Sequence, residues 1–480
     1  MTTTTPADLR TVFESGRTRP LEWRRAQLDG LHRLLVEHGD ELAAALHQDL
    51  GKPATESWLT EIGELINAIT HTEHHLAEWV LPRRVGVPAH LLPATAKVRH
   101  EPKGVVLVIA PWNYPLQLLL SPLIGALAAG NAVILKPSEL STHTADAIAR
   151  LVPEYLDREA VTVVTGGPEV TTELIKAKVD HIFFTGSTRV GKLIMAAAVE
   201  HLTPVTLELG GKSPTYVHDD VNLTHVANRI AWGKFMNCGQ TCVAPDHVLV
   251  HHRVHDQLVT ELAAAIERMY GSDPRSSEAY GRLISTRHTE ELIAKLPQTG
   301  IVTGGQHEVS ERYVAPTVVT EVDPEGPLMA EEIFGPILPV IAVQDVDEAV
   351  NRMNRLATPL AMYLFAEDSS VTESIMDRTA SGGVGIGVPV AHLSVPDLPF
   401  GGLGPSGMGA YHGRDSFDVF THRRAVLRKP LAPDTLRMIY PPFTGLVDTM
   451  IRRIIAPQRR GRLRNDRPHH DDQGPSTDDR

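Results

Sequence analysis

Two cysteines stand close together in the segment GKFMNCGQTCVAPDHVLV, which covers residues 233 to 250. Cys242 follows a glycine-containing turn and precedes a β-branched stretch that predicts a strand. A thiol in such a place can be exposed and aligned for nucleophilic attack, for which the thiolate is the reactive form. A free thiol ionises near pH ~8.5, so this chemistry requires surroundings that favour the charge. The alternative for Cys242 is a small, buried apolar residue, and for Cys238, which directly follows Asn237, we expect such a packed, less reactive thiol.

Two further residues are candidates for chemistry. Glu208 lies between two leucines near the end of an apolar stretch, where an idle carboxylate is costly to bury, so we predict a site role for it. A helix cap or a salt bridge is the alternative. Asn113 stands between two prolines in PWNYP (111 to 115), where the residues by themselves favour an ordinary turn position over a site role. No His or Cys stands at zinc-site spacing from the cysteines, so we predict no metal.

The elements around these residues alternate between strand and helix. The strand-like runs are VVLVIA, AVILKP, VTVVTG, HIFFTG and PVTLELGG, and the segments between them read as helices, including residues 169 to 176. Alternation at this spacing predicts right-handed βαβ units and an open parallel sheet of Rossmann type. The uncharged run from 104 to 135 belongs to this pattern and is not a membrane span, because prolines and Gly130-Asn131 divide it.

Helices and an arm flank this region. Leucines such as Leu28, Leu31 and Leu35 recur at helical spacing in the first eighty residues, which predicts amphipathic helices that cover a sheet. Residues 82 to 101 contain prolines and short alternating segments, which predict an extended arm or hairpin of the kind that pairs with another subunit.

Composition narrows the class of protein. The 480 residues exceed what one core organises, so we expect two or three domains. The 58 acidic residues against 46 Lys and Arg give a net charge of −12, which opposes binding to nucleic acid. Two cysteines are too few for a disulfide scaffold and favour the cytoplasm. The first residues, MTTTTPADLRTVFESG, show no secretory signal.

Six motifs, taken together, resemble the aldehyde dehydrogenase superfamily. They are PWNYP, ILKPSE (134 to 139), FTGSTRVGK (184 to 192), LELGGKSP (207 to 214), the cysteine segment and EEIFGP (331 to 336). SGRTRPLEWRRAQL and LPFGGLGPSGMGAYHGRDSFDVFTHRR are similar to the class 3 branch, and the resemblance covers residues 10 to 445.

The resemblance implies an α/β aldehyde dehydrogenase fold. It has a Rossmann-type NAD(P)-binding domain, an α/β catalytic domain and a small oligomerisation arm. The expected boundaries are 1–82 with 102–205 for the cofactor domain, 206–395 for the catalytic domain, 83–101 with 396–425 for the arm, 426–464 for a C-terminal extension and 465–480 for a disordered tail.

The resemblance also implies NAD(P)-dependent oxidation of an aldehyde to a carboxylic acid. Cys242 is the expected nucleophile, Asn113 and the Cys242 backbone N–H hold the oxyanion, and Glu208 activates water to hydrolyse the thioester. In class 3 the carboxylate of Glu332 is a second candidate base. A CoA-acylating enzyme and a non-catalytic protein on the same fold are the alternatives, and the retained Glu208 argues against the first.

The cofactor site follows a family variant, since no G-x-G-x-x-G follows the first strand. By resemblance, Gly186 and Ser187 open a helix facing the pyrophosphate, Lys136 and Glu139 hold the adenosine ribose, and Glu332 and Phe334 lie around the nicotinamide ribose and ring. Glu139 should repel a 2′-phosphate, which favours NAD over NADP, although class 3 enzymes often accept both.

Three expectations concern specificity and partners. The class 3 resemblance implies medium or long aliphatic or aromatic aldehydes, with Tyr114 and Phe235 lining an apolar tunnel, and a homodimer. Gly387 stands where the family commonly has Asn, so the loop supporting the nucleophile could be looser. The Arg-rich segment 446 to 464 is a solvated tail or a subunit contact rather than a membrane anchor, with peripheral lipid contact as the alternative.

Overall fold

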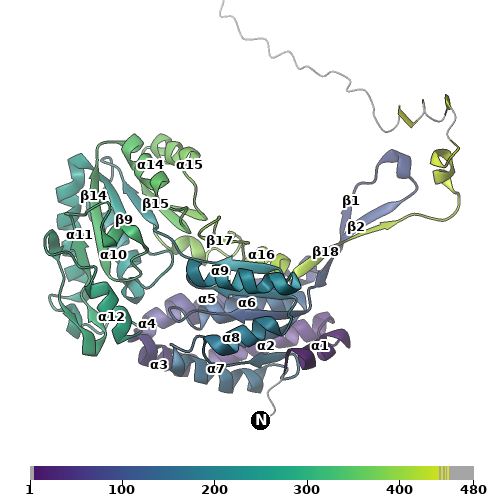
Figure 1. The fold of residues 1–480 in the computed structure, drawn as a ribbon, viewed down its shortest axis with the longest axis horizontal. Helices are drawn as coiled ribbons and strands as arrows, with labels where there is room; N and C mark the ends of the chain where they lie inside the picture. Colours follow the sequence, from purple (N-terminus) through teal and green to yellow (C-terminus); the bar gives the residue numbers. More distant parts are fainter. Residues whose placement is uncertain (1–4, 443–444, 447–448, 450, 453–480) are drawn as a thin grey trace, which may run out of the picture. The chain divides into compact units, whose positions relative to one another are not determined.

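The computed structural model describes residues 5–442, 445–446, 449 and 451–452 (Figure 1). The chain divides into a larger unit, Met1–Leu81 with His100–Arg423, and a smaller unit, Pro82–Arg99 with Arg424–Arg480. Most of the Arg-rich segment 446 to 464 and all of the tail 465 to 480 lie outside the described residues.

Helices form the N-terminal part of the larger unit, as the leucine spacing predicts. The side chains of Leu28, Leu31 and Leu35 are completely buried. The elements are α1 (Pro6–Glu14), α2 (Leu21–Glu37), α3 (Gly39–Leu50), α4 (Ala54–Ser57), the π-helical segment η1 (Trp58–Ile62) and α5 (Gly63–Trp79).

A six-stranded sheet in the order β17-β7-β6-β3-β4-β5 forms one layer of this unit. Its strands are parallel except β17, which pairs antiparallel with β7, so the predicted open parallel sheet is confirmed. The strands are β3 (Val105–Ile109), β4 (Ala132–Lys136), β5 (Val161–Val163), β6 (His181–Thr185), β7 (Val205–Glu208) and β17 (Gly407–Met408). Three of the helices that follow these strands are α7 (Thr142–Tyr155), α8 (Pro168–Lys176) and α9 (Thr188–Ala198).

The uncharged run from 104 to 135 is divided among β3, α6 (Gln117–Ala129) and β4, as predicted. Gly130 ends α6 with a left-handed φ of 88°. All residues of α6 after Gln117 are buried, so the run is apolar because it lies inside the protein. Across the residues that the structure describes, no helix is both long enough and apolar enough to cross a membrane.

A seven-stranded sheet in the order β10-β13-β14-β9-β8-β15-β16 forms the second layer, and it is parallel except for β10. Its strands are β8 (Pro214–Val217), β9 (His247–His251), β10 (Ile301–Thr303), β13 (Thr317–Val319), β14 (Ile337–Val343), β15 (Ala361–Phe365) and β16 (Gly383–Ile386). The remaining α-helices are α10 (Leu223–Phe235), α11 (His255–Tyr270), α12 (Thr286–Ile293), α13 (Pro327–Ala330), α14 (Val346–Arg355), α15 (Ser369–Arg378) and α16 (Gly413–Val419). A small hairpin joins β11 (His307–Glu308) and β12 (Tyr313–Val314).

The smaller unit is built on the hairpin of β1 (Arg83–Val85) and β2 (Thr95–Pro102), with β18 (Thr421–Arg428) beside β2. The predicted hairpin is therefore confirmed. Lys429 Nζ donates hydrogen bonds to the Leu91 carbonyl (2.9 Å) and to Thr435 Oγ1 (2.7 Å) within this unit.

Two domain boundaries fall differently from the expected ones. β7 crosses the expected boundary at 205/206, because its residues pair with β6 and extend the first sheet. Segment 396–425 is not wholly part of the arm: its residues up to Arg423 belong to the larger unit, where Gly407 and Met408 pair with β7. Both differences come from pairing between distant segments, which local spacing does not reveal.

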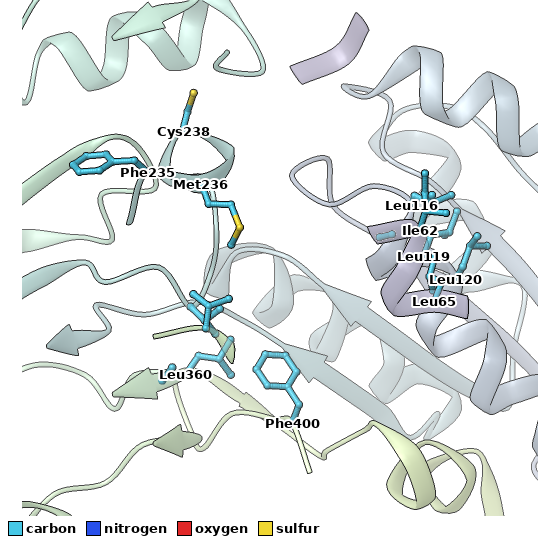
Figure 2. Close-up of a cluster of buried hydrophobic side chains, with 14 of the residues drawn as sticks. Ile62, Leu65, Leu116, Leu119, Leu120, Phe235, Met236, Cys238, Leu360 and Phe400 are labelled. Carbon is cyan, nitrogen blue, oxygen red and sulfur yellow. The ribbon is translucent and has the colours of Figure 1, made fainter. Parts of the chain in front are cut away.

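Apolar side chains from both sheets and from the N-terminal helices form one continuous core. Figure 2 shows part of it, with Phe235 and Cys238 from one segment and Leu116 and Leu119 from another. Because close-packed interiors deform little, this core fixes the six-stranded sheet relative to the segment that carries Cys242.

Candidate active site

A strained turn between α10 and β9 presents Cys242. Asn237, Cys238 and Gly239 have left-handed φ values of 50°, 54° and 72°. Each non-glycine residue in this conformation costs roughly 1–2 kcal/mol, so the surrounding structure must hold the turn. A Cβ on Gly239 would collide with the Gly335 carbonyl oxygen, which explains the glycine. The turn buries Cys238 and leaves Cys242 partly exposed.

The two thiols therefore differ in how accessible they are, whereas the pKa of each is raised. Cys238 is 1% exposed and belongs to the core in Figure 2, and burial followed by the charge of Glu56 raises its pKa to about 12. The expectation that Cys238 is packed is confirmed by its burial in the core. Burial, and then the charges of Glu332 and Glu208, raise the pKa of Cys242 above its ordinary range. Attack by Cys242 therefore needs a base that takes its proton.

Two cavities meet at Cys242. A cleft of about 1520 Å³ contains Asn113, Glu208 and Glu332 in its wall. A second pocket of about 820 Å³ is lined largely by apolar and aromatic side chains. Among the described residues, Leu118 and Cys242 line both. The nucleophile candidate thus stands where a molecule in one cavity would touch a molecule in the other.

Asn113 lies in the loop after β3 and is 2% exposed. Its backbone carbonyl accepts a hydrogen bond from Asn237 Nδ2 (2.8 Å), and its own Nδ2 donates to the Gln240 carbonyl (3.0 Å). An amide nitrogen carries two hydrogens, so one remains for a ligand in the cleft. Asn113 and Cys242 share the cleft wall, as an oxyanion site requires.

A buried ion pair supports the Asn113 loop. Lys52 Nζ lies 2.5 Å from Glu61 Oε1 and 3.5 Å from the Asn113 carbonyl oxygen, and both charged side chains are 0% exposed. Glu61 Oε2 accepts hydrogen bonds from the backbone N–H groups of Leu116 and Gln117, each at 3.0 Å, at the start of α6. No motif marked Lys52 or Glu61, because their partners come together only in the fold.

Glu208 ends β7 and is 2% exposed. Neither of its carboxylate oxygens has a hydrogen-bond partner, and burial raises the pKa of this carboxyl well above its ordinary value. A buried carboxyl without a partner is costly, which favours the predicted site role over a cap or salt bridge. Its high proton affinity makes it a strong base whenever it ionises.

Glu332 follows α13 and lines the same cleft. Burial, and then the charge of Asp246, raise its pKa to about 8, while a hydrogen bond from the Gly211 backbone and the cations Lys212 and Lys234 act in the opposite direction. The structure therefore brings both predicted base candidates to Cys242, whose pKa responds to each of them.

The cleft wall fits a dinucleotide. Gly186 and Ser187 line it, and Ser187 is the N-cap of α9, whose first-turn N–H groups favour an anion. Arg189 adds a cation to this wall. Phe334 lines the other side with a left-handed φ of 51°, and its ring lies 5.4 Å from Trp112, edge to face. The predicted pyrophosphate and nicotinamide residues are thus brought together.

Lys136 and Glu139 are not among the residues that line the cleft. Lys136 ends β4 beside β3, is 2% exposed and donates to the Pro137 carbonyl (2.8 Å). Its Nζ lies 3.7 Å from Glu139 Oε2, and the Glu139 side chain is 45% exposed. Lys136 pairs with Ile109 at the carboxyl ends of β4 and β3, and Trp112 of the cleft wall follows β3 in the chain. The predicted role of Lys136 and Glu139 at the adenosine ribose stays a prediction.

The apolar pocket contains Tyr114 but not Phe235. Tyr114 donates or accepts a hydrogen bond with Thr241 Oγ1 at 2.8 Å, which places its ring beside Cys242. Phe235 is 1% exposed within the core, so the prediction for Phe235 is wrong. Trp232 and Met236, which precede and follow it, line the pocket instead. Trp232 lies on the last turn of α10, and Met236 follows the end of that helix.

Comparison with known proteins identifies the family. Residues 7–426 match the family model described as aldehyde dehydrogenase family. The chain belongs to the aldehyde dehydrogenase family. A solved structure described as the substrate-bound state of Staphylococcus aureus AldH is 41% identical to this aldehyde dehydrogenase. Its TM-score is 0.90, and the match covers 92% of this chain and 97% of that one.

The relatives of this aldehyde dehydrogenase include family 3 members, which confirms the class 3 resemblance. The Rattus norvegicus protein named aldehyde dehydrogenase, dimeric NADP-preferring, is 46% identical over 434 residues, 90% of this chain and 96% of the rat protein. The Homo sapiens protein named aldehyde dehydrogenase family 3 member B1 is 48% identical over 435 residues, 90% of this chain and 93% of the human protein.

Gly387 of this aldehyde dehydrogenase does not line either cavity. It follows β16 with a left-handed φ of 71°, and its carbonyl accepts a hydrogen bond from Arg229 Nη1 at 2.6 Å. Gly and Asn are the residues that most readily adopt this conformation. The backbone geometry therefore explains the glycine, and the bond from Arg229 ties its carbonyl to α10, the helix that precedes the Cys242 turn.

Proposed function

We propose that this aldehyde dehydrogenase oxidises aldehydes to carboxylic acids with NAD(P) as hydride acceptor. The observation that carries the proposal is the position of Cys242 at the junction of an apolar pocket and a cleft that fits a dinucleotide. A carbonyl carbon bonded to this sulfur faces the cleft while the rest of the aldehyde lies in the pocket. Hydride transfer needs that proximity.

The first half of the reaction belongs to Cys242 and Asn113. The sulfur attacks the carbonyl carbon, a C–S bond forms and an electron pair moves to the oxygen. The Cys242 backbone N–H and the remaining Asn113 Nδ2 hydrogen donate to this oxyanion. Glu332, with a pKa of about 8, is a base able to take the thiol proton. Gly186, Ser187 and Phe334 of the cleft wall would hold NAD(P), which would supply the hydride acceptor that the oxidation of the adduct to a thioester requires.

The second half requires a base for water. Glu208 has no competing hydrogen-bond partner, so its ionised carboxylate can take a proton from a water that attacks the thioester carbon. Collapse of that intermediate breaks the C–S bond and returns the electron pair to Cys242. Glu332 is the second candidate for this step, because it shares the cleft wall.

The same proposal includes NAD and NADP as cofactors. The Glu139 carboxylate accepts from a 2′-hydroxyl and repels a 2′-phosphate, whereas the neighbouring Lys136 cation attracts the phosphate. A relative that is 46% identical carries the name NADP-preferring. The two opposing charges therefore support use of both cofactors.

Substrate class and assembly complete the proposal. Trp232, Met236, Val390 and Phe400 line the pocket beside Cys242, which suits a medium or long aliphatic or aromatic aldehyde. A homodimer is supported by the word dimeric in the name of the rat relative. Light scattering tests the dimer, and a monomer at working concentration would refute it.

An aldehyde panel tests the activity. NAD(P)H formation is followed by absorbance, with and without CoA, for the wild type, for Cys242→Ser and for the matched control Cys238→Ser. We expect turnover without CoA in the wild type and in the Cys238 variant, and none in the Cys242 variant. A requirement for CoA would establish the acylating alternative, and no product from any aldehyde would establish a non-catalytic protein.

A further inference from the structure

A second buried ion pair joins three segments of the active site. Lys212 Nζ donates to Asp246 Oδ2 (2.5 Å) and to the backbone carbonyls of Leu328 (2.7 Å) and Glu331 (2.9 Å). Asp246 Oδ1 accepts the backbone N–H of Ile333 at 2.9 Å. The Lys212 and Asp246 side chains are 7% and 4% exposed, so these bonds form away from water.

These contacts enclose Glu332 from both sides. Lys212 binds the carbonyl of Glu331, which precedes Glu332, and Asp246 binds the N–H of Ile333, which follows it. The peptide units on both sides of Glu332 are therefore fixed. Lys212 and Asp246 stand in the LELGGKSP and CVAPD segments, which also carry Glu208 and Cys242. A buried ion pair adds little stability by itself. In this pair, however, the other side-chain hydrogen bonds of Lys212 and Asp246 reach the loop that contains Glu332.

We propose that Lys212 and Asp246 are positioning residues that hold the Glu332 carboxylate in the cleft beside Cys242. The proposal deepens the proposed function, on which it rests for the role of Glu332 in turnover. The Glu332 carboxylate lies against Gly210, where an added side chain would collide with it.

The charges around Glu332 give the two anchors opposite effects. Lys212 and Lys234 lower the pKa of Glu332, and Asp246 raises it. The charge of Glu332 in turn raises the pKa of Cys242. Loss of the Lys212 cation therefore keeps Glu332 neutral to higher pH and favours the thiolate, whereas loss of the Asp246 charge does the reverse. Neither variant replaces Glu208, the other acid whose charge raises the pKa of Cys242.

Alkylation of Cys242 by iodoacetamide in the cofactor-free protein tests the proposal, with the modified peptide measured by mass spectrometry. Lys212→Met should react about threefold faster than wild type near pH ~9, where wild-type Glu332 is ionised, and equally fast near pH ~6.5. Asp246→Asn should react about twofold slower near pH ~7.5, because Glu332 ionises earlier. Asn keeps an Oδ1 that accepts from Ile333, so this variant retains that bond to the loop and loses the bond from Lys212 Nζ to Oδ2.

Adding Glu332→Gln to each of these two variants separates an effect that acts through Glu332 from an effect on the stability of the fold. Both rate changes should vanish in that background. Changes of the same sign in the two variants, or changes that persist in Glu332→Gln, would overturn the proposal. If Lys212→Met fails to fold, Asp246→Asn decides alone. Arg33→Met, which removes an exposed pair with Asp29 (3.2 Å), is the control. Absence of aldehyde oxidation in the wild type would contradict the proposed function without changing the alkylation result.

Discussion

Asn113→Ala should reduce aldehyde turnover far more than it reduces stability. The substitution removes one of two oxyanion donors and leaves the Cys242 N–H, a loss that costs roughly 10²–10³ in kcat. In the resting protein it removes the bond from Asn113 Nδ2 to the Gln240 carbonyl (3.0 Å), which is worth about 1 kcal/mol. The bonds from Lys52 and Asn237 reach the Asn113 backbone carbonyl and survive. The Gln240 carbonyl also keeps Asn237 Nδ2 at 3.3 Å.

The assay pairs steady-state kcat at saturating aldehyde and NAD(P) with the free energy of unfolding in urea. Asn113→Asp is the matched variant, since its carboxylate has the same shape but donates nothing and repels the oxyanion, so its kcat should be at least as low. The reasoning would be refuted if Asn113→Ala kept kcat within about threefold of the wild type. An equal loss of kcat and of folded protein would likewise place Asn113 in the structure and not in the reaction.

Four further expectations follow from the site. Because burial raises the pKa of Glu332 to about 8, its base form appears as pH rises, so kcat should increase through about pH 8 and this rise should flatten in Glu332→Gln. Trp232→Ala enlarges the apolar pocket, so the ratio of kcat/KM for a bulky aromatic aldehyde to that for hexanal should rise at least about threefold. Gly387→Val should lower the free energy of unfolding in urea by about 1–2 kcal/mol, because a β-branched residue is strained at a φ of 71°. Gly387→Asn should change this free energy by less than about 1 kcal/mol, because Asn tolerates that conformation. Glu139→Gln should raise kcat/KM for NADP relative to NAD, and an unchanged ratio would remove Glu139 from cofactor choice.

The parallel cofactor sheet was predictable because each strand is a short apolar run followed by a helical segment. The strands β3, β4 and β6 are buried on both faces and therefore largely apolar, so their sequences identify them without tertiary information. The antiparallel strand β17 was not predictable, since Gly407–Met408 is two residues long and pairs with a strand far away in the chain. The same pairing explains why residues up to Arg423 leave the predicted arm.

The candidate site divides in the same way. Cys242, Glu208 and Asn113 each stand in a short motif, and the structure brings all three to one cleft. Phe235 was misplaced because a helix turns about 100° per residue, so neighbours of a pocket residue point elsewhere. Lys52 carries no local signal, because its functional neighbours come from other elements. Such buried ion pairs become visible only when the chain is folded.

The small overlap between the two cavities bears on how this enzyme can diversify. Because Leu118 and Cys242 alone, of the residues that the structure describes, line both cavities, most residues of the apolar pocket can change without altering the wall of the cleft. Substitutions in the pocket can therefore change the preferred aldehyde without changing the cofactor preference of the cleft. The two binding sites therefore meet at the Cys242 sulfur and share little else.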